Sequence, residues 1–447
     1  MAMTGIEIFK LLPKTNCKKC GQPTCLAFAM KLAQRQVSID ACPDVSDESR
    51  QRLTDASAPP IRLVTIGIGE NAIKIGEETV LFRHEKKFFH PCALSVEIKD
   101  IITDNEILGI VKDILDSGIE RVGQRLRIDA IFIDNTSNDP DRFLKVVGMV
   151  YANASHLPLI LSTKNPDTAA KALELTKGLN PLLYGITVDN IDPMCEVAKR
   201  YKVPVGLTTD GIEMMAELTQ KVKARGISDM VIDTQPKTAR EILEHNTLIR
   251  RSAIKKGVKS LGYPIITFAK RADDTVETLV ASLGILKYSS VLVLSTVKKH
   301  KNLALFTLRQ NIYTDPQVPM QVEQKIYKIG EPTPTSPLIV TTNFSLTYFI
   351  VSGEIENSKV PARLAIMDCE GLSVLTAWAA GKFTASRIAN FIKESGVEKE
   401  LTRKELIIPG YVAILSGAIE EKLPDWKVTV GPREANALPS FLKAWNQ

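Results

Sequence analysis

Residues 204–233, PVGLTTDGIEMMAELTQKVKARGISDMVID, contain one complete unit of the pattern that decides the fold. The unit opens with a short apolar run at 204–207, continues with amphipathic spacing over 212–224, and ends in a second apolar run at 230–233. Apolar runs without polar alternation are typical of parallel strands that are buried on both faces. The stretch therefore predicts a β-strand, a covering α-helix and the next parallel strand.

The same pattern recurs through the middle of the chain. Apolar runs that we interpret as strands lie at residues 95–99, 130–134, 158–162, 184–188, 204–207, 230–233, 264–268 and 291–294. Eight β/α units within roughly 200 residues are typical of a TIM barrel, so we predict an α/β fold with a closed (β/α)8 barrel at 61–315. An open doubly wound sheet is the alternative. Residues 61–92, at the start of this domain, alternate as a β-hairpin would.

A second α/β unit follows a proline-rich crossing at 311–337, which we interpret as a semi-rigid linker. Its predicted strands lie at 338–341, 364–367, 406–408 and 427–430. A helix-like segment follows each strand, which predicts a compact Rossmann-like domain at 326–447. Ligands of open α/β sheets bind outside the carboxyl ends of the strands. Small residues there would let the backbone approach a large flat ligand; the other interpretation is that they only mark loops.

Four of the seven cysteines fall within the first 42 residues, as Cys17-x2-Cys20-x4-Cys25-x16-Cys42, followed by Pro43. Close spacing lets one tight loop offer three thiolates to one metal centre, and Cys42 supplies the fourth after a short helix. Four cysteines suit an iron–sulfur cluster or tetrahedral zinc. Zinc ribbons usually carry two C-x2-C pairs and this chain has one, so a [4Fe–4S] cluster is favoured and zinc is the alternative.

The cysteine segment forms a separate small domain in this interpretation. A Ser-Ala-Pro-Pro stretch at 57–60 looks like a linker, so the [4Fe–4S] domain is predicted at 1–58. Such a short segment buries little apolar surface, and a bound metal would also supply folding energy.

Polar residues gather where the predicted barrel strands end, among them Asp134, Asn135, Asp189 and Asn190. Active sites of TIM barrels form at these ends. The simpler interpretation is that these residue types cap the helices that follow. The sequence contains no HExxH or P-loop pattern, and its five histidines have no metal-ligand spacing.

The overall composition is that of an ordinary globular chain, with 44% hydrophobic and 24% charged residues among 447. The net charge of +6 is small for this length, which argues against a nucleic-acid binder. No secretory signal is evident. No membrane span is evident either, because the long uncharged stretch at 332–353 is broken by prolines. We therefore expect a cytoplasmic protein with no membrane or nucleic-acid partner.

The chain has a rare order of domains: a four-cysteine segment, then a TIM barrel, then a small Rossmann-like domain. With the Cys17–Cys42 motif and the loops after 341 and 369, the chain resembles the large (gamma) subunit of the corrinoid iron–sulfur protein of the reductive acetyl-CoA pathway. The resemblance covers essentially the full length. It implies a [4Fe–4S] cluster on Cys17, Cys20, Cys25 and Cys42 and a cobamide in the C-terminal domain.

The resemblance also implies where the cobamide binds. The expected cofactor-binding residues lie in four loops: Thr341, Thr342, Asn343, Phe344, Leu346, Glu370, Gly371, Leu372, Ser373, Val374, Pro409, Gly410, Gly431, Pro432 and Arg433. The cobamide of this family is base-off and has no protein histidine on cobalt. The absence of histidine after His300 agrees with that expectation.

The implied function is that of a methyl carrier rather than a stand-alone enzyme, with no catalytic residues of its own. The cobamide would accept a methyl group from methyltetrahydrofolate on a separate methyltransferase and donate it to acetyl-CoA synthase/CO dehydrogenase. The cluster would return Co(II) to Co(I), using electrons from a ferredoxin-like reductant. A small subunit would complete a heterodimer.

Two other functions remain open at this point. The chain could be a pterin-dependent methyltransferase whose site is the polar set at Asp134, Asn135, Asp189 and Asn190. It could instead be an iron–sulfur electron-transfer subunit without a corrinoid.

Overall fold

The computed structural model describes residues 4–33, 36–46, 49–50, 53, 59–271 and 273–445. These residues form two compact units, one made of 1–118 and 127–313 and the other of 119–126 and 314–447. Within the described residues, no helix has both the length and the apolarity needed to span a membrane.

The first unit contains a closed barrel of eight parallel strands, so the predicted TIM barrel is confirmed and the open sheet is excluded. The barrel strands are β3 (Ala93–Lys99), β6 (Ala130–Asp134), β7 (Leu159–Ser162), β8 (Leu182–Ile186), β9 (Val205–Thr208), β10 (Met230–Asp233), β11 (Ile265–Phe268) and β12 (Ser289–Leu294). Neighbours in the chain are neighbours in the barrel, and β12 pairs with β3 to close it.

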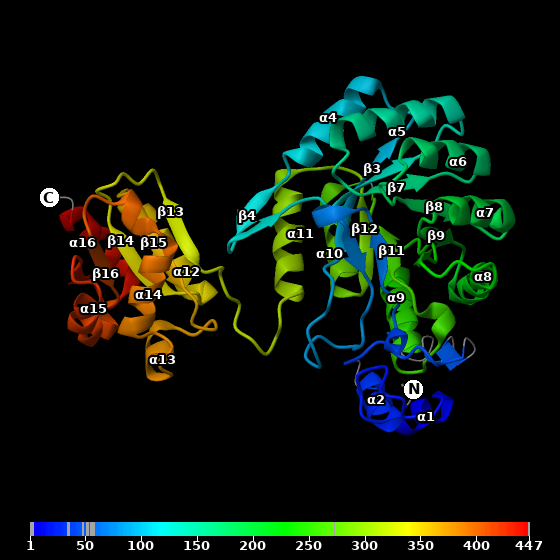
Figure 1. Cartoon of the computed structure of the whole chain (residues 1–447). Helices are drawn as coiled ribbons and strands as arrows, with labels where there is room; N and C mark the ends of the chain where they lie inside the picture. The colour runs from blue at the N-terminus through cyan, green and yellow to red at the C-terminus, as the bar shows by residue number, and fades with distance from the viewer. Residues whose placement is uncertain are drawn as a thin grey trace. The chain divides into compact units, whose positions relative to one another are not determined.

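Helices surround this barrel, as Figure 1 shows. They are α4 (Asp104–Leu115), α5 (Pro140–Ala154), α6 (Pro166–Leu175), α7 (Ile191–Tyr201), α8 (Ile212–Ala224), α9 (Ala239–Ile254), α10 (Asp274–Leu286) and α11 (Lys299–Ile312). The local sequence determines where two of these helices begin. Asp139 caps α5 and Asn165 caps α6, and a proline occupies the first position of each helix.

The predicted N-terminal hairpin is also present, as β1 (Val64–Ile66) paired antiparallel with β2 (Ile73–Ile75). Its apolar side chains join the core inside the barrel. The hairpin bonds to segments that precede barrel strands, since Gly67 N donates to Asn180 O at 2.8 Å. It therefore covers the amino ends of the strands and leaves the carboxyl ends as the open mouth.

The second unit contains a five-stranded sheet in the order β13-β15-β14-β16-β17. Its strands are β13 (Lys325–Ile329), β14 (Leu338–Thr342), β15 (Ala362–Met367), β16 (Glu405–Ile408) and β17 (Lys427–Val430). All pairs are parallel except that of β13 with β15. The four parallel strands are those that the sequence predicts.

Helices cover both faces of this sheet (Figure 1). The helices α12 (Ser345–Ser358) and α16 (Leu438–Trp445) contribute to the core on one face. On the other face lie α13 (Val374–Ala379), α14 (Ala385–Ser395) and α15 (Ser416–Lys422).

Two features of this unit differ from the sequence analysis. The crossing at 311–337 is not simply a linker, because it contains the edge strand β13; buried Tyr327 and Ile329 alternate there with exposed Lys328. A small hairpin, β4 (Ile119–Arg121) and β5 (Gln124–Leu126), also belongs to this unit, and its Val122 packs into the core that contains Tyr327. The sequence analysis did not anticipate that hairpin.

The N-terminal segment has its own small apolar core. It contains α1 (Gly5–Leu11), α2 (Cys25–Ala33) and a 3-10 turn, η1 (Ile39–Ala41). Cys25 and Cys42 are among the buried members of this core. The linker predicted at 57–60 lies partly outside the described residues: the structure describes residues 59 and 60 but not 57 and 58.

Candidate functional site

The cysteine loop between α1 and α2 bends back on itself. Lys14, Asn16, Lys18 and Gly21 all have positive φ, between 49° and 74°, so the backbone turns sharply several times. The Asn16 side chain fixes one of these turns, because its Oδ1 accepts from Cys25 N at 2.8 Å. Asn16 N in return donates to Cys25 Sγ at 3.4 Å.

The fourth predicted ligand, Cys42, lies close to the other three. Burial raises the pKa of the Cys42 thiol, and a backbone hydrogen bond from Asp44 opposes that effect. The neighbouring thiols of Cys20, Cys17 and Cys25 raise the pKa further. Lys19 and Asp44 tie the two segments together through an ion pair at 3.0 Å. That bond lowers the pKa of the Asp44 carboxyl.

The donor set fits a metal centre that takes thiolates. Four sulfurs come from one loop and one following segment, and backbone N–H groups supply hydrogen bonds to sulfur. In the described residues, no three Cys, His, Asp or Glu side chains are already arranged around a single metal position. Metal binding and the final arrangement of this loop would therefore be coupled.

The sheet of the second unit opens at its carboxyl edge between β14 and β16. These two strands pair only through Leu338 with Leu406 and Ile339 with Ile407. Each of the two strands stays paired further along with its other neighbour. Thr342 of β14 pairs with Met367 of β15, and Ile408 of β16 pairs with Val430 of β17. The chain leaves β14 toward α12 on one face and β16 toward α15 on the other. This is the switch point at which open α/β sheets bind ligands.

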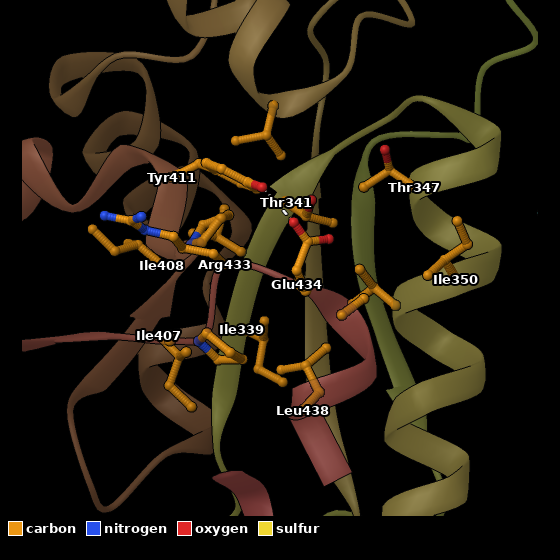
Figure 2. A pocket seen from close by; sticks show the side chains of 17 residues that line it. Ile339, Thr341, Thr347, Ile350, Ile407, Ile408, Tyr411, Arg433, Glu434 and Leu438 are labelled. Atoms are coloured by element: carbon orange, nitrogen blue, oxygen red, sulfur yellow. Dashed lines mark hydrogen bonds between the residues drawn. The ribbon is translucent and has the colours of Figure 1, made fainter. Parts of the chain in front are cut away.

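A crevice of about 230 Å³ lies at this switch point, with its walls shown in Figure 2. It is lined by Ile339, Val340, Thr341, Thr347, Ile350, Val351, Val374, Ile407, Ile408, Pro409, Tyr411, Gly431, Pro432, Arg433, Glu434, Ala435 and Leu438. Apolar side chains form most of the wall, and the Tyr411 hydroxyl bonds to the Glu434 carboxylate across it. Six of the fifteen predicted cofactor residues are in this set: Thr341, Val374, Pro409, Gly431, Pro432 and Arg433.

Two loops on one side of the crevice touch through their backbones. Gly410 N donates to Pro432 O at 3.1 Å, and Gly431 N donates to Ile408 O at 2.9 Å. A Cβ on Gly410 would lie 2.6 Å from Gly431 O and 2.8 Å from Arg433 N. Only glycine therefore fits at 410, and the wall beside it is backbone rather than side chain.

Asn343 is buried and organises the loops instead of facing the crevice. Its Oδ1 accepts from Cys369 N at 2.9 Å and from Gly371 N at 3.0 Å. Its Nδ2 donates to Asp368 Oδ1 at 2.9 Å and to Gln321 Oε1 at 3.3 Å. All four hydrogen-bonding positions of the amide are thus used within the protein. The loop held in this way contains Glu370 and Gly371, both at positive φ.

The remaining predicted residues surround the crevice without lining it. Thr342 is buried, and its hydroxyl has no partner in the described part of the chain. Phe344 directly precedes α12, and Glu370 is exposed and paired with Lys382. Leu372 and Ser373 are half-buried in the loop before α13.

Exposed apolar side chains occur on the segments that follow β14, β15 and β16 and at the end of β17. They are Leu346, Phe349, Leu375, Trp378, Tyr411, Ile414 and Val430, each at least 40% exposed. Apolar side chains left exposed together are typical of an interaction surface. A crevice of about 230 Å³ is smaller than the 300–1,000 Å³ that usually encloses a ligand, so it suits one projecting part of a larger molecule.

The polar residues predicted at the barrel mouth play mixed roles. Asn190 bonds its own loop, since its Oδ1 accepts from Thr187 N at 2.8 Å and its Nδ2 donates to Lys164 O. Asp189 is exposed. Asp134 accepts from the hydroxyls of Ser162 and Thr136, and Asn135 donates to Thr163. Asn190 occupies the N-cap position of α7, as the capping interpretation predicts, but its side chain makes no capping hydrogen bond. Asp134 does not cap α5, whose N-cap is Asp139, so the interpretation is wrong for Asp134.

Sequence reasoning missed several crevice residues. Thr347 and Ile350 face the crevice from α12, and their i, i+3 spacing on a predicted helix is a signal that could have found them. Glu434 and Leu438 come from the segment after β17, whose packing against β14 and β16 no local pattern indicates.

Two family profiles match the chain. Residues 63–442 match the family described as CO dehydrogenase/acetyl-CoA synthase delta subunit. Residues 12–43, which contain the four cysteines, match a family described as a putative Fe-S cluster. Together the two profiles account for most of the sequence.

Full-length relatives show the same relationship. The corrinoid/iron-sulfur protein large subunit of Moorella thermoacetica is 44% identical, and the match covers 99% of both chains. The acetyl-CoA decarbonylase/synthase complex subunit gamma of Methanothermobacter thermautotrophicus is 34% identical, again over 99% of both. Among solved structures, dihydropteroate synthase from Thermus thermophilus matches 56% of this chain and 99% of its own at 16% identity and a TM-score of 0.39, which is too distant to carry an argument. The chain belongs to the family of corrinoid/iron–sulfur protein large subunits and acetyl-CoA decarbonylase/synthase gamma subunits.

Proposed function

We propose that the chain is the cofactor-carrying large subunit of a methyl-transfer system in the acetyl-CoA pathway. It would hold a cobamide at the carboxyl edge of the second unit and a [4Fe–4S] cluster on Cys17, Cys20, Cys25 and Cys42. The name of the Moorella relative supports both cofactors, and the family profile over residues 12–43 supports the iron–sulfur cluster. The observation that carries the proposal is the crevice at the β14/β16 switch point with its backbone walls.

When bound, the cobamide supplies a cobalt nucleophile that takes up and releases a methyl group, and the cluster supplies an electron that restores the active oxidation state. The chain's own residues bind and orient these groups. Apolar side chains such as Ile339, Ile407 and Leu438 would enclose one projecting part of the cobamide. The exposed apolar side chains beside the crevice would lie under or beside its flat ring.

The polar groups of the second unit favour amide side chains on the ligand. The absence of a side chain at Gly410 lets its loop pack directly on the backbone of Gly431 and Arg433, which line the crevice and leave polar backbone groups beside it. The sequence has no histidine after His300, so this unit offers cobalt no imidazole, which supports the base-off form. We infer that the second unit is a Rossmann-like corrinoid-binding domain on these grounds.

The domain division 1–58, 61–315 and 326–447 is part of the same proposal, with one cofactor at each end of the chain. The partners that we propose are a small subunit, a methyltetrahydrofolate methyltransferase, acetyl-CoA synthase/CO dehydrogenase and a ferredoxin-like reductant. The methyl group would pass from the first enzyme to the second through this protein.

The deciding experiment is metal analysis with a visible spectrum on the full chain, purified without oxygen after co-expression with the small subunit. We expect about four irons and one cobalt per chain, with corrinoid absorption bands. Cys17→Ser should lower the iron content, while Cys195→Ser, a buried cysteine within α7, should leave it unchanged. Iron without cobalt, even after addition of cobamide, would reduce the protein to an electron-transfer subunit. Zinc in place of iron would refute the cluster.

A further inference from the structure

The carboxyl end of the barrel contains a pocket that the proposed function does not use. This mouth pocket has a volume of about 280 Å³ and is lined by Tyr184, Asp233, Gln235, Pro236, Lys237 and Phe268. Tyr184, Asp233 and Phe268 lie near the carboxyl ends of β8, β10 and β11. The open end of a TIM barrel is where such folds bind ligands.

Asp233 is a buried carboxyl with only neutral partners. It is 2% exposed, its Oδ2 accepts from the Tyr184 hydroxyl at 2.7 Å, and its Oδ1 accepts from Gln235 N at 2.8 Å. Within the described ranges it makes no salt bridge; Lys237 pairs instead with Asp210 at 3.4 Å. Burial raises the pKa of Asp233 to about 6, while its hydrogen bonds from Tyr184, Gln235 and Thr208 and the charge of Lys237 oppose that rise. Near neutral pH Asp233 is therefore largely charged, and no cation bonds it directly in the described part of the chain.

Aromatic rings stand beside this carboxyl. The ring centroids of Phe132, Tyr184 and Phe268 are 5.3 to 5.7 Å apart, in tilted and edge-to-face arrangements. The barrel backbone makes room for them, because a Cβ on Gly206 would lie 2.6 Å from the Tyr184 ring. A carboxylate beside aromatic rings is the environment in which proteins bind organic cations.

The neighbouring charges reinforce this preference. Burial, then the charges of Asp233 and Asp134, hold the pKa of the Tyr184 hydroxyl well above its usual value. Asp134 itself has only hydroxyl partners, from Ser162 and Thr136. Glu97 is offset by Lys270 at 3.6 Å and Lys99 at 4.0 Å. Asp134 and Asp233 therefore bring negative charge to the barrel mouth that no ion pair offsets within the described residues, while Lys237 on the rim is paired with Asp210.

We propose that the mouth pocket binds a small planar organic cation of the amidinium or guanidinium class. An N–H group of the cation would donate to the lone pair that the Asp233 carboxylate keeps beside its bonds from Tyr184, Gln235 and Thr208, and the plane of the cation would lie against the aromatic rings. Gln235 and Lys237 form the rim, where the ligand would meet solvent. This site is separate from the crevice and does not depend on either cofactor.

The test uses benzamidine as the probe, with the full chain and saturation-transfer NMR or calorimetry at pH 7.5. We expect benzamidine to bind, and benzoate and benzyl alcohol, which share its ring, to bind at least about tenfold more weakly, a difference of about 1.4 kcal/mol. Equal binding of the three compounds, or no binding of benzamidine, would overturn the proposal without any variant.

Two substitutions locate the site. Asp233→Asn keeps the shape of the side chain and removes its charge, and it should weaken benzamidine binding at least about tenfold. Asp189→Asn removes an exposed charge at the same barrel mouth, from a residue outside the pocket lining, and should change binding less than about twofold. Undiminished binding to a folded Asp233→Asn protein would place the cation elsewhere and refute the assignment. The metal content of the wild-type protein tests the proposed function independently.

Discussion

The mouth of the barrel and the crevice of the second unit are built by one topological rule but offer opposite chemistry. Both lie at the carboxyl ends of parallel strands. In the barrel, every strand is paired on both sides, and inward-facing side chains form the floor, including the buried acid Asp233. In the sheet, two strands separate, and one wall of the crevice is held in place by backbone contacts between the loop at Gly410 and the loop at Gly431.

This difference shows what closure of a sheet does to a ligand site. A closed barrel places side chains around an axis, so its site is defined by the charge and shape of those side chains. An open sheet with helices on both faces leaves a slot, so its site is defined by how closely the backbone approaches. Ligand binding at the barrel mouth should therefore be sensitive to loss of charge, and ligand binding at the crevice should be sensitive to added side-chain volume. The predictions below test that contrast, beginning with the largest expected effect.

Gly410→Val should abolish cobamide retention. The added side chain would begin 2.6 Å from Gly431 O and would push apart two loops that form one wall of the crevice. Overpacking of this kind costs about 1–3 kcal/mol, and we expect cobalt content to fall to below about a tenth of the wild-type value. Cobalt analysis after anaerobic purification measures the effect. Gly417→Ala in α15, where a Cβ meets nothing within 4 Å, is the matched control. Normal cobalt in Gly410→Val would show that the backbone wall does not contact the cofactor.

Asn343→Ala should destabilise the second unit and loosen the loop at 369–371. The substitution leaves the buried N–H groups of Cys369 and Gly371 without an acceptor, at a cost of about 3 kcal/mol or more. Urea unfolding and the rate of cobalt loss on dilution measure the two consequences. Asn357→Ala, an exposed asparagine in α12, should change neither quantity. A stable variant that loses cobamide at the wild-type rate would remove Asn343 from the support of the site.

How far the sequence predicted these two sites follows from the kind of interaction that forms each. Strands buried on both faces produce continuous apolar runs, so all eight barrel strands and the four parallel strands of the second unit were predicted correctly. The edge strand β13 was missed because prolines surround it and only one of its faces is buried. The hairpin at 119–126 was missed because its partners lie some 200 residues away in the chain.

The sites themselves were less predictable. Glycine and proline after each strand indicated the crevice, because backbone approach requires particular residue types. Glu434 and Leu438 reach the same crevice through long-range packing that no local pattern indicates. Asp233 is the last residue of the strand predicted at 230–233, and its pairing with Tyr184 depends on the register between strands two positions apart in the barrel, which no local pattern indicates.

The pH dependence of stability should differ between wild-type and Asp233→Asn. The pKa of Asp233 is about 6 in the folded protein and 3.8 ordinarily, so the folded state holds this proton more tightly. The resulting stability is present below pH 3.8 and is lost as the pH rises through 6, by about 3 kcal/mol in total. Relative to wild-type, Asp233→Asn should therefore gain stability between pH 4.5 and 7.5 in urea unfolding. Asp189→Asn, which removes an exposed carboxyl at the barrel mouth, should follow wild-type; a parallel curve for Asp233→Asn would mean that the buried carboxyl titrates normally.

Two tyrosine substitutions give the smallest effects and the finest comparison of the two sites. Tyr184→Phe leaves the buried Asp233 carboxylate without one of its three donors, which should cost about 1–3 kcal/mol of unfolding free energy. Tyr411→Phe removes a hydroxyl that bonds Glu434 at the exposed edge of the crevice, and water can replace that bond. We expect no resolvable change in urea unfolding for Tyr411→Phe. If both variants lost equal stability, the crevice would depend on polar side chains as the barrel mouth does, and the contrast between a side-chain site and a backbone site would fail.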